Sequence, residues 1–118
     1  MAITVTNPDV GPGAGQRFFI NATSADASGC ETLRAGTAGK RIVLENILIN
    51  SDAAITVTIG QGETGSAVTE AVFGPVAMAI NGTVTFEAQS LALDAGEDLT
   101  VDASGAGNIL IFIRGRLV

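Results

Sequence analysis

Apolar and polar residues alternate in short stretches along the chain, and turn-forming residues separate these stretches. Ile55, Val57 and Ile59 fall on one side of such a stretch and Thr56 and Thr58 on the other, which is the period of a half-buried β-strand. No window of useful length has the helical period. The pattern predicts about eight strands in all. Besides residues 55–59, the segments with strand character are residues 3–6, 17–21, 41–50, 67–80, 83–87, 91–93, 99–102 and 109–113.

Segments rich in glycine, proline and small polar residues separate these strands. Asn7–Gly15 contains two prolines and three glycines, so we expect neither helix nor central strand there. Residues 22–39 show no clear period and are predicted to be a loop, with room for one helical turn at Glu31–Arg34. Gly60–Gly65 is predicted to break the chain again, and Asn81-Gly82 is the best hairpin turn because both residues tolerate positive φ.

Regular short strands with turns between them are typical of an all-β fold of two packed antiparallel sheets. We therefore predict a jelly-roll β-sandwich of about eight strands with an amino-terminal arm. Residues 1–16 are assigned to the arm and its Gly/Pro tether, and residues 17–118 to a single jelly-roll domain. A chain of 118 residues is long enough to bury one such core without disulfides or metals.

Two strands carry apolar residues on both faces. Ile109–Ile113 is apolar throughout, and residues 41–50 are nearly so, with Glu45-Asn46 as an interruption that indicates a bulge or a functional edge. One face of a sandwich sheet normally meets water, so these strands should have more apolar surface than one chain can bury. A second copy of the chain is the simplest cover. The alternative is that the amino-terminal arm or the loop at 22–39 folds over that face.

The composition makes catalysis improbable, and we expect no enzyme activity and no cofactor. The chain has no His, Tyr or Trp, so it lacks the usual general base, the commonest metal ligand and the preferred sugar-stacking rings. Six basic and twelve acidic side chains give a net charge of −6, which disfavours nucleic acid and anionic membrane surfaces as partners. The first residues also lack the pattern of a secretory signal.

Three local features have some of the residues of a chemical site. Gly11–Gly15 superficially resembles a phosphate loop, but no Lys-Ser/Thr pair follows, so a flexible tether is favoured. The acidic residues 94, 97, 98 and 102 contain the oxygen ligands that calcium prefers, without the spacing of an EF-hand, and ordinary solvated turn charges are the alternative. Cys30, next to Glu31, has no neighbour that would lower its pKa and is expected to be an incidental thiol. The four acidic residues with the oxygen ligands that calcium prefers are Asp94, Glu97, Asp98 and Asp102.

The basic residues cluster at two places in the sequence, which fits either protection of apolar strands against aggregation or docking onto an acidic protein surface. Lys40-Arg41 precedes the strand at 41–50, and Arg114 and Arg116 close the last strand. The amino-terminal strand can in addition pair with the sheet edge of a partner. The predicted partner-binding residues are Ile3, Val5, Lys40, Arg41, Leu110, Phe112, Arg114 and Arg116.

The order of three segments resembles the small jelly-roll capsid decoration (cement) proteins of tailed bacteriophages. These segments are Ala38–Ile47, Ala53–Ile59 and Leu91–Val101, and the resemblance covers residues 38–118. It implies a homotrimer, made in the host cytoplasm, that sits on the outer capsid surface of the virion and clamps neighbouring major capsid subunits. The amino-terminal arm would reach a neighbour. This family has no short catalytic motif, so the resemblance assigns no residue roles.

Two other functions remain open from the sequence. One is a receptor- or carbohydrate-binding jelly roll of a phage fibre, although such sites usually present Trp or Tyr. The other is a structural protein of the tail or neck.

Overall fold

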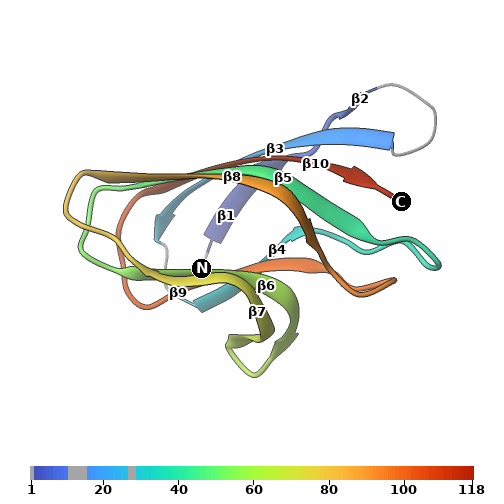
Figure 1. Ribbon diagram of the computed structural model, residues 1–118. Helices are drawn as coiled ribbons and strands as arrows, with labels where there is room; N and C mark the ends of the chain where they lie inside the picture. The colour runs from blue at the N-terminus through green and yellow to red at the C-terminus, as the bar shows by residue number, and fades with distance from the viewer. Residues whose placement is uncertain (1, 11–15, 27–28) are drawn as a thin grey trace.

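Two antiparallel β-sheets packed face to face form the fold in the computed structural model, which describes residues 2–10, 16–26 and 29–118 (Figure 1). The larger sheet has the strand order β1-β3-β10-β5-β8, with β2 pairing with β3, and the smaller has the order β4-β9-β6-β7. The described residues form the strands β1 (Ala2–Thr6), β2 (Asp9–Val10), β3 (Gln16–Asp26), β4 (Gly29–Arg34), β5 (Ile42–Ser51), β6 (Thr56–Thr64), β7 (Ala67–Ala77), β8 (Gly82–Ala92), β9 (Leu99–Ala103) and β10 (Ile109–Leu117).

The pairing of the strands is that of a jelly roll. Strand β6 pairs with β7, β5 with β8, β4 with β9 and β3 with β10, so each pair encloses the previous one along the chain. A long hairpin with nested pairs of this kind, rolled so that alternate pairs fall in opposite sheets, gives the observed strand orders. The predicted fold class, an antiparallel jelly-roll sandwich, is confirmed.

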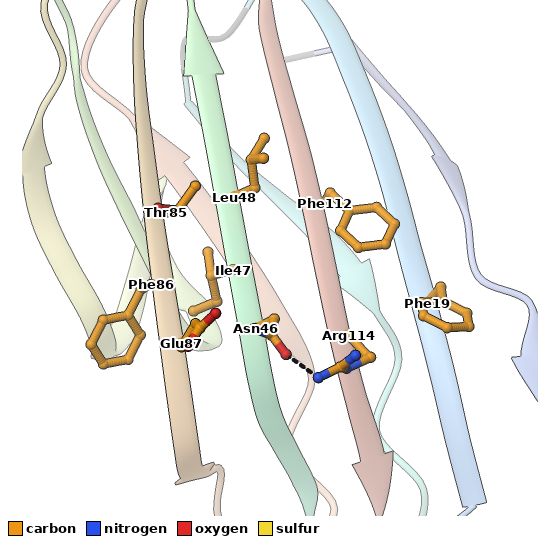
Figure 2. A pocket seen from close by; sticks show the side chains of 9 residues that line it. All are labelled: Phe19, Asn46, Ile47, Leu48, Thr85, Phe86, Glu87, Phe112 and Arg114. Atoms are coloured by element: carbon orange, nitrogen blue, oxygen red, sulfur yellow. Dashed lines mark hydrogen bonds between the residues drawn. The ribbon is translucent and has the colours of Figure 1, made fainter.

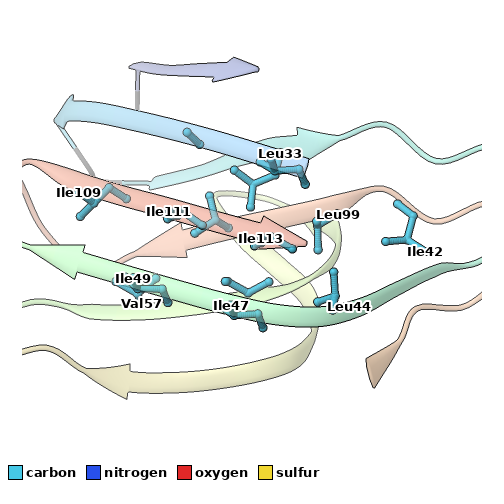
Figure 3. Packing of buried hydrophobic residues seen from close by; sticks show 14 of the residues in the cluster. Leu33, Ile42, Leu44, Ile47, Ile49, Val57, Leu99, Ile109, Ile111 and Ile113 are labelled. Carbon is cyan, nitrogen blue, oxygen red and sulfur yellow. The ribbon is translucent and has the colours of Figure 1, made fainter. Parts of the chain in front are cut away.

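The core lies between the two sheets (Figure 3). Ile109, Ile111 and Ile113 on β10 point inward and are at most 3% exposed. Val57 and Leu99 meet them from the smaller sheet and are fully buried. Each such side chain contributes about 1.5–3 kcal/mol through burial. The period-2 pattern of the sequence therefore identifies the inward face of these strands correctly.

The expected interruption of the strand at 41–50 is a β-bulge at Glu45. In the pairing with β10, Asn46 lies opposite Arg114 and Leu44 opposite the next residue, Gly115, so Glu45 is the extra residue on the bulged strand. The register of β5 with β8 is also irregular between Leu44 and Asn46. The predicted hairpin turn is also confirmed, because Asn81 adopts a φ of 56° between β7 and β8.

Two predicted breaks are wrong. Residues 22–39 were expected to form a loop, but β3 continues to Asp26, and β4 occupies Gly29–Arg34 in place of the helical turn. Ala22 and Ser24 face inward there, and side chains this small conceal the alternation of a strand. Gly60–Gly65 was expected to interrupt the chain, yet β6 extends to Thr64.

The amino-terminal segment belongs to the larger sheet of the same chain. Strand β1 pairs with β3 in antiparallel register, and Ile3 and Val5 pack partly buried against the core. Asn7 donates a hydrogen bond to the carbonyl oxygen of Leu33. The predicted arm is therefore an edge strand of the larger sheet over residues 2–6, because its apolar side chains find cover within the chain. The predicted tether at 11–15 lies outside the described residues.

Among the residues that the structure describes, no helix is long and apolar enough to cross a membrane.

Candidate functional site

The chain covers part of the outer face of the smaller sheet with its own β6–β7 hairpin. This hairpin bends near Gly60 and Gly62, and its tip turns back beside the sheet (Figure 1). The backbone N–H of Val68, just past the tip, donates a hydrogen bond to the carboxylate of Asp102 on β9. Glu63 makes a side-chain hydrogen bond with Cys30 on β4.

The hairpin changes the chemistry of the two side chains that it approaches. Burial raises the pKa of the Cys30 thiol to about 12, and the hydrogen bond with Glu63 and the charges of Glu63, Asp102 and Glu31 act in the same direction. The thiol is therefore protonated at neutral pH and a poor nucleophile. Burial likewise raises the pKa of Asp102. The expectation that nothing lowers the pKa of Cys30 is confirmed.

The four acidic residues considered for calcium do not converge. Asp94 accepts a hydrogen bond from the side-chain amide of Gln61, Asp98 accepts one from the backbone N–H of Gly36, and Asp102 is held by Val68. Glu97 is exposed. In the described part of the chain, no group of three or more His, Cys, Asp or Glu side chains is placed to hold a metal ion.

The outer face of the larger sheet has a different character. The outward side chains of β10 run from basic to apolar, with Arg116 and Arg114 followed by Phe112 and Leu110. Phe112 and Leu110 each remain 37% exposed. We call the outer surface of β3, β10 and β5 the open face, because no described segment crosses it. Its outward residues include Arg17, Phe19, Asn46, Leu48, Leu110, Phe112, Arg114 and Arg116.

An apolar strip occupies the middle of the open face (Figure 2). The rings of Phe19 and Phe112 stack with their centroids 5.9 Å apart. Leu48 lies directly opposite Phe112 in the pairing of β5 with β10. Half-exposed rings fixed on a sheet lose little conformational freedom on binding, which favours their use as contact residues.

A groove of about 560 Å³ runs along this strip. Its polar wall includes Arg114, which donates a hydrogen bond to the side-chain oxygen of Asn46 across the two strands (Figure 2). The groove is lined by Phe19, Asn46, Ile47, Leu48, Thr85, Phe86, Glu87, Phe112 and Arg114.

One end of the open face is basic. Arg17 on β3 lies directly opposite Arg116 on β10. Arg116 forms an ion pair with Glu45 of the bulge at 3.4 Å. A hollow of about 270 Å³ opens between these strands and is lined by Arg17, Phe19, Glu45 and Arg114.

The other end of the open face is polar. Asp52 accepts hydrogen bonds from the side chain and the backbone of Asn108, at 2.6 and 2.7 Å, and these lower its pKa. A second groove of about 530 Å³ lies there, lined by Thr4, Thr23, Ser24, Asn50, Asp52, Asn108, Ile109 and Leu110.

Some of the predicted partner-binding residues lie on the same surface in the structure, and others do not. Leu110, Phe112, Arg114 and Arg116 lie together on the open face. Lys40 and Arg41 lie at its basic end, where Arg41 pairs through its backbone with Val118, and its guanidinium also donates to the carbonyl oxygen of Leu93.

Ile3 and Val5, which are also predicted to bind a partner, do not belong to this surface. They face the core, and Thr4 and Thr6 take the outward positions of β1.

Sequence reasoning missed Arg17, Phe19 and Leu48. All three occupy outward positions of strands that were themselves predicted, so the alternation of β3 and β5 contained the signal. The expected surplus of apolar surface on β5 and β10 is present as the strip that includes Leu48 and Phe112. Within the residues that the structure describes, β1 is an edge strand and residues 22–26 and 29–34 belong to the sheets, so these parts of the two expected intramolecular covers do not lie over the strip.

Comparison with known proteins identifies no family. No protein-family profile matches the sequence, and no curated protein matches it. Among solved structures, the chain is similar to a carbohydrate binding module (CBM6cm-2) from Cellvibrio mixtus lichenase 5A in complex with cellotriose. The match has a TM-score of 0.44 and 15% sequence identity, and it covers 95% of this chain and 86% of that chain. A likeness at this level carries no inference about function.

Proposed function

We propose that this chain is a non-enzymatic structural protein of a tailed-bacteriophage virion, a homotrimeric capsid decoration (cement) protein. Its open face binds the outer surface of the phage head and stabilises contacts between major capsid subunits. The sequence resemblance supports the assignment to decoration proteins, and the open face supplies a surface suited to docking.

The contrast between the two outer faces carries the proposal. The smaller sheet has its own hairpin against its outer side, whereas the larger sheet leaves Phe112 and Leu110 each 37% exposed beside arginines. Apolar patches that are rimmed by polar and charged groups mark protein-binding surfaces. Aromatic and arginine side chains are also the commonest energetic centres of such interfaces.

The chemistry of the chain is consistent with a structural role. The sequence has no His, and in the described residues the one thiol is held protonated by burial and by acidic neighbours. A cement protein needs no reactive centre, because binding at many equivalent sites on a particle supplies its avidity.

The decisive experiment adds purified protein to heads of the phage that encodes it, prepared without this chain. We expect saturable binding and a higher temperature of head disruption. Phe112→Ser should weaken binding about 30-fold or more, the effect of losing an interface residue worth at least about 2 kcal/mol.

Ile80→Ser is the matched control for Phe112→Ser. Ile80 is 69% exposed but lies beside the β7–β8 turn, away from the open face, so its removal should leave binding unchanged. Heads that bind no wild-type protein, or that bind Phe112→Ser as tightly as Ile80→Ser, would contradict the proposal.

A second candidate is a receptor- or carbohydrate-binding module of a phage fibre. The groove favours it, since stacked phenyl rings lie there beside hydrogen-bonding groups of Asn46, Arg114 and Glu87. A clear hit on a glycan array that Phe112→Ser abolishes would support this function over the first. Copy number in the virion would separate a cement protein, with hundreds of copies, from a tail, neck or fibre protein, with a few to dozens.

A further inference from the structure

The basic end of the open face contains a pair of like charges that lowers the stability of the folded chain. Arg17 and Arg116 are directly opposite each other on neighbouring antiparallel strands, and both point outward. Like charges in such cross-strand pairs are destabilising. This pair occurs in a chain that has six basic residues and twelve acidic ones.

The groups around this pair neutralise it incompletely. Glu45 contacts Arg116 at 3.4 Å, and Arg114 is hydrogen-bonded to Asn46, whose amide carries no charge. Within the described part of the chain, Arg17 has no ion-pair partner. Glu45 is therefore the one carboxylate that lines the hollow beside Arg17 and Arg114.

The hollow at this place has room for a further acidic group. It measures about 270 Å³ and lies between Arg17 and Arg114, with Glu45 and the ring of Phe19 on its other sides. Guanidinium groups bind carboxylates through paired, charge-assisted hydrogen bonds, which are stronger than neutral ones. The Phe19 ring continues into the apolar strip through its stacking on Phe112.

We propose that the hollow binds an Asp or Glu side chain of the capsid protein, from a segment that also places apolar side chains on the Phe19–Phe112 strip. This proposal rests on the proposed function, because it names the chemistry of the partner at the same surface. Charge complementarity selects the acidic group, and the adjoining rings select its apolar neighbours. A nucleic acid is a poor alternative, since the net charge of −6 repels a polyanion.

The test compares Arg17→Gln with Lys40→Gln, an exposed cation at the same end of the sheet but outside the hollow. Binding to heads that lack this protein is measured at several salt concentrations, and thermal unfolding is measured on the isolated variants. Arg17→Gln should weaken binding at least fivefold and flatten its salt dependence. Its unfolding midpoint should not fall, because the substitution removes a like-charge contact.

Glu45→Gln provides a change in the opposite direction. Removing the one carboxylate beside the hollow should strengthen binding to the same heads, a gain that misfolding cannot imitate. If Arg17→Gln binds like Lys40→Gln, or if Glu45→Gln fails to strengthen binding, the inference is wrong while the proposed function stands. If Arg17→Gln instead dissociates the trimer, the carboxylate comes from a second copy and the assignment to the capsid protein is overturned. Wild-type protein that does not bind heads would overturn the proposed function and this inference together.

Discussion

The carboxylates of Asp102 and Asp52 lie in contrasting environments, and their pKa values are shifted in opposite directions. Asp102 is half-buried on β9, and burial raises its pKa even though Val68 donates a hydrogen bond to it. Asp52 is exposed, and the hydrogen bonds from Asn108 lower its pKa. The folded state therefore favours the protonated form of the first residue and the ionised form of the second.

These directions predict opposite dependences of stability on pH. Because the folded pKa of Asp102 is above the unfolded value of 3.8, its favourable contribution is present below that pH and is lost as the pH rises through the folded pKa. Asp102→Asn should therefore gain stability relative to the wild type as the pH is raised from about 3 to 6. Urea unfolding at several pH values measures this difference.

Asp52→Asn is the control for that series. The lowered pKa of Asp52 makes its contribution present above 3.8 and lost as the pH falls through the folded value. This variant should be less stable than the wild type at neutral pH and approach it in acid. Parallel pH profiles for the two variants would contradict the assigned environments.

At the scale of single elements, the β6–β7 hairpin depends on a glycine at its bend. A Cβ on Gly60 would lie 2.2 Å from the carbonyl oxygen of Glu70, a backbone atom that cannot move aside without shifting the paired strand. The register of β6 with β7 is irregular at this same place, between Ile59 and Gly60. The bend therefore requires a residue without a side chain.

Gly60→Ala should accordingly destabilise the protein by about 1–3 kcal/mol. The variant should also expose Cys30, because the same hairpin supplies the Glu63 contact that helps to raise the pKa of this thiol. Alkylation with iodoacetamide at pH 8, compared with the wild type, measures the exposure, and urea unfolding measures the stability. Gly105→Ala is the control, since its new Cβ would make an ordinary contact of 3.4 Å with Ile55. An unchanged alkylation rate in Gly60→Ala would show that the hairpin does not protect Cys30.

The edge strand β1 also has an expected energetic role. Deleting residues 1–10 removes the partly buried Ile3 and Val5 and the ion pair of Asp9 with Arg34 at 2.7 Å. We expect a loss of about 2–4 kcal/mol in the free energy of unfolding, mostly from apolar burial, because exposed ion pairs contribute little. The outward substitutions Thr4→Ala and Thr6→Ala should change stability by less than about 0.5 kcal/mol. A deletion as mild as these substitutions would show that β1 is not held on the sheet.

The elements differ in how far the sequence predicts them. Strands with large side chains on alternate positions, such as β6 and β10, are visible as a local pattern, and so is the bulge at Glu45. The end of β3 is not, because Ala22 and Ser24 contribute too little apolar contrast, although tertiary packing buries both. The pairing of residues 2–6 with β3 is not visible in the sequence either, since an edge strand has the same alternating pattern whether it pairs with its own sheet or with that of a neighbour.

At the scale of the whole molecule, charge is distributed unevenly. All six basic residues lie at one end of the sandwich, because the starts of β3 and β5 and the ends of β4 and β10 meet there. Acidic residues accompany them, because Asp9 and Glu45 form ion pairs with Arg34 and Arg116, and the turn at residues 94–98 is hydrogen-bonded to the backbone of Lys40. Asp52 lies at the other end of the open face. Cations gathered at one end can still help to orient a subunit relative to an acidic partner.

The proposed homotrimer is the prediction that belongs to this scale. We expect sedimentation equilibrium at micromolar concentration to give three times the chain mass of 11.9 kDa. Closed symmetric homo-oligomers are the usual assemblies of soluble chains, and the resemblance to decoration proteins implies three copies. A monomer at that concentration would contradict the trimer and leave the open face to the capsid alone.

The sequence alone was sufficient for the fold class, for the inward face of most strands and for the shortage of catalytic side chains, because alternation and composition are local properties. It also predicted that β5 and β10 would have apolar surface left over. Only the tertiary structure decided which part of that surface stays open, since this depends on where β1 and the β6–β7 hairpin pack. The meeting of Arg17 with Arg116 depends likewise on the register between strands from opposite ends of the chain, which no local pattern contains.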